Sequence, residues 1–276
     1  MVPASLFKQG VTYTQAEHTI IDFISSNPTE FLVMPIQQLA ERLGVSDATV
    51  SRFARHAGFR DFKELKGAIA AGTLGPAEKL AASIGNSPSS PVSFLKRQQG
   101  YLDVTAERAD PEEFAHAVEA LAGAQLVLIH GKGAARACAE LLRFRLARFG
   151  LRVEMLPAGG SELFEGLVHA CPGSAVVTFG FSRIPTESSV IIEHARSVGA
   201  TSILFSSRSH RGTDARADIE LLAYRGEPLE YHSMASAVAL VDALVVSVAA
   251  RLDGTATERL DRLRKLKRSY EGRLPR

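Results

Sequence analysis

The sequence predicts two domains, an all-α bundle followed by an α/β domain built on a parallel sheet. With 276 residues, of which 46% are hydrophobic, the chain is long and apolar enough for two cores. Helical periodicity runs to about residue 71, whereas short apolar runs alternate with helical segments beyond residue 124. Between these regions, residues 72–91 are rich in Gly, Pro and Ser, which is typical of a linker.

These changes in sequence pattern set the expected domain boundaries. We expect a helical domain at residues 1–75, a linker with a connecting helix at 76–107, the α/β domain at 108–256 and a basic tail at 257–276. No run reaches the roughly 18 apolar residues of a membrane span, and no signal peptide is evident, so we expect a cytoplasmic protein without a membrane partner. Cys138 and Cys171 lie in apolar surroundings without CxxC spacing, which favours reduced core residues; we expect no metal and no cofactor.

A capping box opens the first expected helix. The Thr14 hydroxyl and the Glu17 carboxylate can each satisfy a free backbone N–H, and Ile20 and Ile24 then face inward. We expect this helix to end at Asn27-Pro28.

Residues 35–57 predict two short helices joined by a tight turn. Ile36, Leu39 and Leu43 form an apolar stripe of helical period, and Gly44 follows as a stop signal. Ser46 can cap the second helix by accepting a hydrogen bond from its first turn. Helix, turn and helix in this order favour a helix-turn-helix, although any small α-hairpin shares the pattern.

The second of these helices carries a polar and basic outer face. Val50 and Phe53 point inward, and five positive charges lie at Arg52, Arg55, Arg60, Lys63 and Lys66. A helix with such a face enters the major groove in helix-turn-helix proteins. The expected DNA-binding residues are Ser46, Asp47, Thr49, Ser51, Arg52, Arg55, His56, Arg60 and Lys63.

The run MPIQQLAERLGVSDATVSRFARHAGFRDFKELK resembles the N-terminal domain of the RpiR family of bacterial transcription regulators. The resemblance includes the Ser-x-Ala-Thr-Val-x-Arg-Phe core at residues 46–53 and Gly-Phe-x-x-Phe-x-x-Leu-Lys at residues 58–66. It implies that the partner of this domain is an operator in double-stranded DNA.

Helices continue the chain as far as the first strand. We expect them at residues 61–71, as one short piece within the linker, at 93–108, and from Pro111 onward with Asp110 as the cap. Five strands are then expected at 125–130, 152–156, 175–179, 202–205 and 219–222, separated or followed by helices at 134–149, 161–170, 185–198 and 233–252. This alternation predicts a doubly wound five-stranded parallel sheet, with ligands bound beyond its carboxyl edge, on the loops after strands one, three and four.

The loop after the first strand, His130-Gly131-Lys132-Gly133, opens a helix. Two glycines let the backbone approach an anion at the helix N-terminus, although a tight turn without ligand remains the alternative. IHGKGAARACAELLRFRLARFG resembles the opening of a sugar isomerase (SIS) domain, the flavodoxin-like phosphosugar-binding fold that RpiR regulators carry. Compared with that family, Ala135 replaces a serine, and the loop after strand three retains Ser182 but has Thr186 one position late. A sugar phosphate is therefore one candidate among anions.

Charges on the strand-end loops could replace the missing hydroxyls. Lys132, Arg183 and Arg208 fall there, each with a solvated surface charge as the alternative. We expect a small anionic metabolite as effector. The expected effector-binding residues are Gly131, Lys132, Gly133, Ala135, Ser182, Arg183, Thr186, Ser206, Ser207 and Glu230.

Two functions remain open at this point. The fused DNA-binding domain favours a transcription regulator that is not an enzyme. The alternative is a phosphosugar aldose–ketose isomerase with an accessory helical domain, since Glu227, Glu230 and His232 could move protons.

The tail offers Leu260, Leu263, Leu266 and Tyr270 at helical spacing among basic residues. We expect a homodimer or tetramer that covers this stripe, with coverage by its own domain as the alternative.

Overall fold

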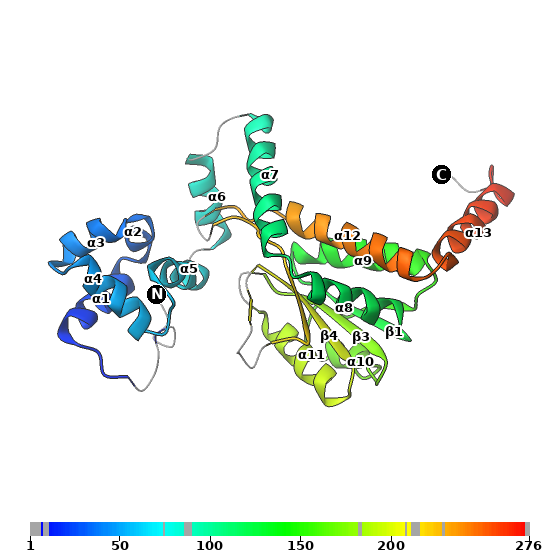
Figure 1. The fold of residues 1–276 in the computed structure, drawn as a ribbon, viewed down its shortest axis with the longest axis horizontal. Coiled ribbons are helices and arrows are strands. Elements are labelled where there is room, and N and C mark those ends of the chain that lie inside the picture. The colour runs from blue at the N-terminus through cyan, green and yellow to red at the C-terminus, as the bar shows by residue number, and fades with distance from the viewer. Residues whose placement is uncertain are drawn as a thin grey trace. The chain divides into compact units, whose positions relative to one another are not determined.

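The computed structural model describes Phe7 and residues 11–73, 75–85, 90–181, 184–207, 209–210, 216–227 and 230–273 (Figure 1). Contacts within the chain divide it into two compact units. The first combines Met1–Ser90 with Gly226–His232, and the second combines Pro91–Arg225 with Ser233–Arg276.

The first unit is helical, as the sequence predicts. Its helices are α1 (Gln15–Ser26), α2 (Pro28–Val33), α3 (Ile36–Leu43), α4 (Asp47–His56), α5 (Phe62–Thr73) and α6 (Pro76–Gly85). Helix α2 was not expected, because Asn27-Pro28 was interpreted only as an end signal. Pro28 instead occupies the first position of a new helix, where its missing N–H costs nothing. Phe31 and Leu32 of α2 are buried in the core of this unit.

Glu17 joins the start of α1 to the end of α4. The predicted capping box is confirmed, with the Thr14 N–H donating to Glu17 Oε2 at 2.8 Å. The other carboxylate oxygen lies 2.8 Å from His56 Nδ1. Burial alone would raise the pKa of Glu17, but hydrogen bonds from Thr14 and His56 and the charge of His56 outweigh it and hold the pKa below its ordinary value.

Lys66 also serves the packing of this unit. Its Nζ donates to the carbonyl oxygens of Leu32 at 3.0 Å and Met34 at 2.5 Å, at the end of α2. Burial lowers the pKa of this lysine. Lys66 therefore ties α5 to α2, so this one of the five positive charges counted in the sequence serves packing.

The second unit is the predicted α/β domain. It begins with α7 (Pro91–Arg108) and α8 (Pro111–Ala122) and ends with α12 (Ala235–Arg251) and α13 (Thr255–Ser269). Between them lie β1 (Leu126–His130), α9 (Ala135–Arg148), β2 (Val153–Met155), α10 (Glu162–Leu167), β3 (Ser174–Phe179), α11 (Thr186–Ser197), β4 (Thr201–Ser206) and β5 (Ile219–Leu222). All described strand pairs are parallel, in the order β2-β1-β3-β4-β5.

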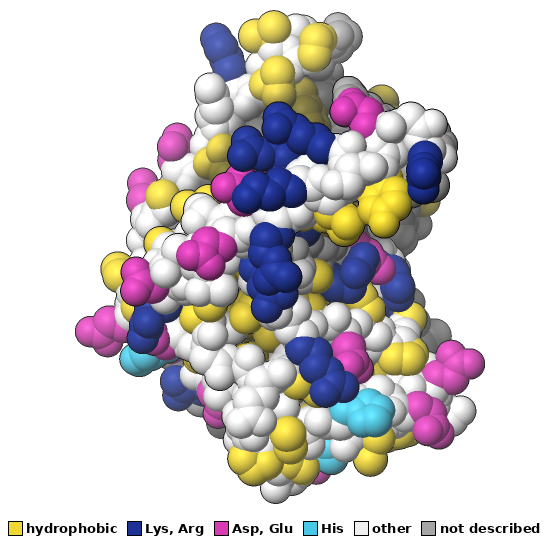
Figure 2. Space-filling view, turned by 90° about the vertical axis from the view of Figure 1, so that its right-hand side faces the viewer, with side chains coloured by type: hydrophobic (Ala, Val, Ile, Leu, Met, Phe, Trp, Pro, Cys, Tyr) yellow, Lys and Arg dark blue, Asp and Glu magenta, His cyan; other side chains and the backbone are white. Residues whose placement is uncertain are grey.

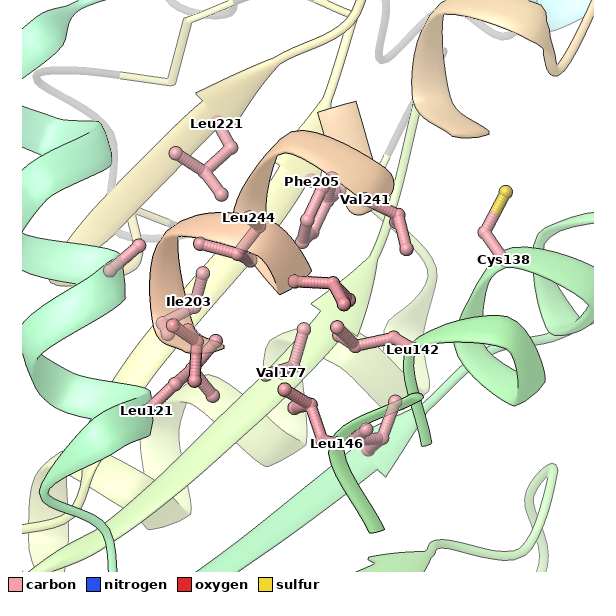
Figure 3. Close-up of a cluster of buried hydrophobic side chains, with 14 of the residues drawn as sticks. Leu121, Cys138, Leu142, Leu146, Val177, Ile203, Phe205, Leu221, Val241 and Leu244 are labelled. Carbon is pink, nitrogen blue, oxygen red and sulfur yellow. The ribbon is translucent and has the colours of Figure 1, made fainter. Parts of the chain in front are cut away.

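Helices cover both faces of this sheet. On one face, α8, α9 and α12 contribute Leu121, Leu142 and Leu244 to a core that includes Val177 and Phe205 (Figure 3). On the other face, α10 and α11 pack Leu163, Leu167 and Ile191 against Val176 and Leu128. Helix α9, which follows β1, and helix α11, which follows β3, thus lie on opposite faces. The point between β1 and β3 is therefore the topological switch point.

Two further expectations concern the surface. Cys138 is buried as expected, but Cys171 is exposed in the turn before β3, where its N–H donates to Ser174 Oγ at 3.2 Å. Among the described residues, no single helix has the length and apolar character needed to cross a membrane, and α12 with α13 meets both only as a pair bent by 100°.

The Glu17 contact predicts an acid-dependent stability of the first unit. A carboxylate whose pKa is lowered by folding contributes stability above its unfolded pKa of about 4.3, and this contribution is lost as the pH falls through the folded pKa. Glu17→Gln should lower the free energy of unfolding near neutral pH by about 1–2 kcal/mol and flatten its acid dependence. Urea unfolding followed by NMR signals of the first unit measures both effects. Glu41→Gln, at an exposed site on α3, is the control, and equal behaviour of the two variants would contradict the assignment.

Candidate functional site

The turn between α3 and α4 has the geometry that its sequence predicts. Gly44 adopts a left-handed conformation with φ of 64°, and the Val45 N–H donates to the Ala40 carbonyl at 2.9 Å. Ser46 then caps α4, its Oγ accepting from the Thr49 N–H at 3.1 Å. The two helices are fixed as a rigid pair, with Phe53 buried beneath them.

The outer face of α4 presents most of the predicted DNA-binding residues. Asp47, Arg52 and Arg55 are exposed, while Thr49 and Ser51 are half-buried. Arg52 Nη2 lies 3.4 Å from Thr49 Oγ1, and Arg55 Nε lies 3.4 Å from the Ser51 carbonyl oxygen. These contacts are local to the helix and exposed, so a phosphate or a base edge can replace them at little cost.

The remaining predicted DNA-binding residues lie at the edge of this face or beyond it. His56 contacts Glu17, and its ring also meets the Tyr13 ring edge-on at 5.4 Å, so it has a structural role at the end of α4. Arg60 pairs with Asp61 at 3.4 Å, and within the first unit Lys63 pairs with Glu227 at 3.0 Å. Both cations are largely exposed, and such pairs contribute little to stability.

In the second unit, His130 forms the buried floor of the loop after β1. Its Nε2 lies 3.3 Å from the Ala158 carbonyl oxygen, and its Nδ1 lies 3.4 Å from Thr178 Oγ1. Thr178 Oγ1 in turn lies 2.6 Å from Ser188 Oγ of α11. Burial lowers the pKa of His130, which favours the neutral ring. This network fixes the ends of β1 and β3 and the start of α11 relative to one another.

Two helix N-termini lie on either side of the switch point. Ala134 precedes α9 and Pro185 precedes α11, and neither cap residue provides a side-chain hydrogen bond. The predicted residues Ala135 and Thr186 are the first residues of these helices. Free N–H groups and the positive ends of the helix dipoles can together bind an anion.

The glycines of the first loop have different structural roles. A Cβ on Gly131 would lie 2.8 Å from Ala139 Cβ and 3.0 Å from the Ala135 carbonyl oxygen, so packing requires glycine at this position. Gly133 has a φ of 58° and space around it. A substitution of Gly131 would therefore test packing more than ligand binding.

Lys132 has a partner that sequence reasoning missed. Its Nζ lies 2.6 Å from Glu187 Oε1 in the first turn of α11. The hydrogen bond from Lys132 lowers the pKa of the Glu187 carboxyl below its ordinary value. Lys132 thus bridges the two loops at the switch point, and a ligand anion would compete with Glu187 for it.

The hydroxyls after β4 contact protein groups. Ser206 Oγ lies 3.0 Å from His210 Nε2, and Ser207 Oγ donates to the Phe181 carbonyl oxygen at 2.7 Å. Ser206 and His210 are both buried. Ser182, Arg183 and Arg208 lie outside the described residues, so their predicted roles rest on the sequence alone.

The residues after β5 divide between the two units. Glu230 belongs to the segment Gly226–His232 of the first unit, where its Oε2 accepts from the Glu227 N–H at 3.1 Å. His232 Nε2 lies 3.3 Å from the Glu227 carbonyl oxygen. Arg225, which the sequence did not indicate, belongs to the second unit and donates from Nε to the Ser233 carbonyl at 2.8 Å. In the described part of the chain, no group of three His, Cys, Asp or Glu side chains could hold a metal ion.

Known proteins resemble both parts of this arrangement. A family model for the helix-turn-helix domain of the rpiR family matches residues 4–73. An uncharacterized HTH-type transcriptional regulator of Caldanaerobacter subterraneus subsp. tengcongensis is 25% identical over 256 residues, covering 90% of each chain. Residues 4–73 therefore form a helix-turn-helix domain of the rpiR family.

Solved structures agree with this family and with the fold. The sugar isomerase domain of an RpiR transcription factor from Sphaerobacter thermophilus matches with a TM-score of 0.59 and 25% identity, over 64% of this chain and 99% of that one. The NanR protein of Vibrio vulnificus, complexed with ManNAc-6P, matches with a TM-score of 0.60 and 19% identity, over 94% of this chain and 95% of that one. The second unit therefore has the fold of a SIS domain.

The geometry of α4 predicts distinct effects for two cations. Arg52→Ala should weaken specific operator binding by about 1–3 kcal/mol if the guanidinium reaches a base edge. Lys63→Ala, outside α4, should weaken binding to all sequences alike and lower the salt slope by about 1. Fluorescence anisotropy with operator and random DNA at several salt concentrations separates the two. Unchanged operator affinity of Arg52→Ala would contradict the role of this face.

Proposed function

We propose that this protein is an RpiR-family regulator that reads an operator through the outer face of α4, and that a small anionic metabolite bound to the SIS domain changes its affinity for DNA. The observation that carries the effector proposal is the pair of helix N-termini of α9 and α11, which flank the switch point without side-chain caps. Lys132 lies at the same place and adds a positive charge.

A sugar phosphate is the first candidate for this effector. NanR, which has the same fold, is complexed with ManNAc-6P, a phosphorylated sugar. Because Ala135 lacks a hydroxyl and Ser207 already donates to a carbonyl oxygen, backbone N–H groups and cations would hold most of the anion here. A carboxylate satisfies the same groups, so we propose an anionic metabolite as the class and a phosphosugar as its first member.

We further propose that the SIS domain binds this effector without turnover. Isomerisation needs a side chain that takes up and returns a proton. The pKa of the buried His130 is lowered and its ring nitrogens face Ala158 and Thr178, while His232 faces a backbone carbonyl oxygen. These contacts favour a binding role over the isomerase alternative.

A homodimer formed through the second unit is the proposed assembly. Leu260 of α13 packs against the core of its own domain, whereas Leu266 and Tyr270 are 57% and 49% exposed. Together with Leu263 they line a groove of about 860 Å³. Lys and Arg side chains gather around apolar ones on the face shown in Figure 2. The long aliphatic parts of these Lys and Arg side chains can keep the charges in water while a second copy of the chain covers the apolar strip. The two helix-turn-helix domains of such a dimer would read two half-sites.

The effector proposal is tested by DNA affinity with and without metabolites. A phosphorylated or carboxylated sugar that binds the folded state should raise the thermal midpoint of the wild type and shift its operator affinity. Lys132→Ala should abolish most of this response while leaving operator binding without effector near normal. Loss of basal DNA binding in Lys132→Ala would indicate a structural role for the loop, and product formation from a phosphosugar would favour the isomerase.

The assembly proposal is tested on the full chain. Leu266→Arg should convert the dimer to a monomer in sedimentation velocity, because it adds a charge to an apolar strip that Arg148, Arg264 and Lys267 already line. Phe164→Arg is the control, since Phe164 of α10 is 58% exposed on the opposite face of the sheet. A dimer that persists in Leu266→Arg, or a monomeric wild type, would contradict this surface.

A further inference from the structure

We propose that the groove between the end of α9 and α13 binds a nucleoside triphosphate, with the phosphates on arginine side chains and the base against Phe144. This site is separate from the proposed effector site. Helix α9 begins after β1, at the carboxyl edge of the sheet, and ends before β2, at the opposite edge. The groove is lined by the last part of α9, so it lies away from the switch point.

The size and charge of the groove suit a small anionic ligand. Its volume is about 570 Å³, within the range of about 300–1,000 Å³ that is typical of ligand sites. Arg143 and Arg148 line it from α9, and Arg259 and Arg262 line it from α13. Among the described residues, no acidic side chain lines it. The groove therefore has a positive charge that its own walls do not neutralise.

Two of these arginines have no charge partner in the part of the chain that the structure describes. Arg143 is paired with Glu140 at 2.8 Å. The guanidinium groups of Arg259 and Arg262, in contrast, make no ion pair or hydrogen bond with any described residue. They are three positions apart on α13 and share one face of it, and like charges at this spacing destabilise a helix. A bound anion of high charge would remove this repulsion.

Arg259 lies against the end of α9. A Cβ on Gly150 would lie 2.9 Å from the Cζ and Nε atoms of Arg259, and Gly150 has a φ of 88°. Glycine at this position therefore leaves room for the guanidinium. Contact with the backbone orients this group without neutralising its charge, and its planar set of N–H donors matches the geometry of phosphate oxygens.

Phe144 supplies an aromatic wall to the same groove. Its side chain is 50% exposed, and the Cζ atom of Arg148 lies 5.4 Å from the centroid of its ring. A nucleic-acid base can stack on an exposed aromatic ring, whereas inorganic phosphates use only the cations. An aromatic ring beside unpaired guanidinium groups thus favours a ligand that has both a planar base and several phosphates.

The groove borders the apolar strip that is proposed for dimer formation. Leu263 and Leu266 line both, but Phe144, Arg259 and Arg262 line only the groove. Variants of these three side chains leave the strip intact, so they test ligand binding separately from assembly.

The experiment uses the full chain with ATP, tripolyphosphate, AMP and adenosine as probes at physiological salt. Calorimetry gives each affinity, and the thermal midpoint without ligand reports folding. We expect ATP to bind most tightly. Arg259→Gln and Arg262→Gln should each weaken ATP binding about tenfold, because each removes a charge-assisted hydrogen bond to phosphate. Phe144→Ala should remove the advantage of ATP over tripolyphosphate, with a thermal midpoint close to that of the wild type.

Arg145→Gln is the matched control. Arg145 is also an exposed arginine in the last turn of α9 that has no charge partner among the described residues, but it does not line the groove. A second control is Lys132→Ala, since Lys132 lies at the switch point. Both variants should bind ATP as the wild type does.

Four results would overturn the inference and leave the proposed function intact. They are a wild type that does not bind ATP, equal affinities for ATP and tripolyphosphate, equal weakening in Arg145→Gln, and loss of ATP binding in Lys132→Ala but not in Arg262→Gln. A fifth result would assign the groove to the DNA backbone instead. In that case Arg259→Gln and Arg262→Gln would weaken binding to random duplex DNA and leave the affinity for ATP unchanged.

Discussion

The proposed effector site depends on one constraint, the placement of α9 and α11 on opposite faces of a single parallel sheet. Because β1 and β3 are neighbours, the two helices diverge from adjacent strand ends and leave their N-termini at one point. The apolar contacts of Leu142 with the α12 face, and of Ile191 with the α10 face, maintain that divergence. Loss of either packing layer would move a helix dipole away from the anion that it is proposed to bind.

A small number of side-chain contacts likewise positions the proposed DNA-binding face of α4. Glu17 completes the capping box of α1 and also contacts His56 at the end of α4, so one carboxylate joins the first helix to α4. Lys66 does the same for α5 and α2. The exposed residues of α4 can then contact DNA without contributing to the stability of the bundle.

Local signals predicted those parts of the molecule that local chemistry determines. The stripe from Ile36 to Leu43, the glycine at position 44 and the cap at Ser46 gave the helix-turn-helix, and the five apolar runs gave the sheet and its order of strands and helices. The sequence pattern could not reveal contacts between residues that are distant in the sequence. Glu187 is 55 positions from Lys132, and Phe181, whose carbonyl oxygen accepts from Ser207, is 26 positions from that serine. Helix α2 was missed because proline both ends and begins helices.

Hydrogen exchange of backbone amides at the switch point tests directly whether the N-termini of α9 and α11 bind the effector. Hydrogen exchange of the full chain, measured with and without 6-phosphogluconate, reports the amides at the starts of α9 and α11. We expect slower exchange at Lys132 to Ala135 and at Thr186 to Ser188 when the anion binds, because those N–H groups are the proposed donors. Ligand binding that leaves both segments unchanged and protects only α13 or the first unit would contradict it.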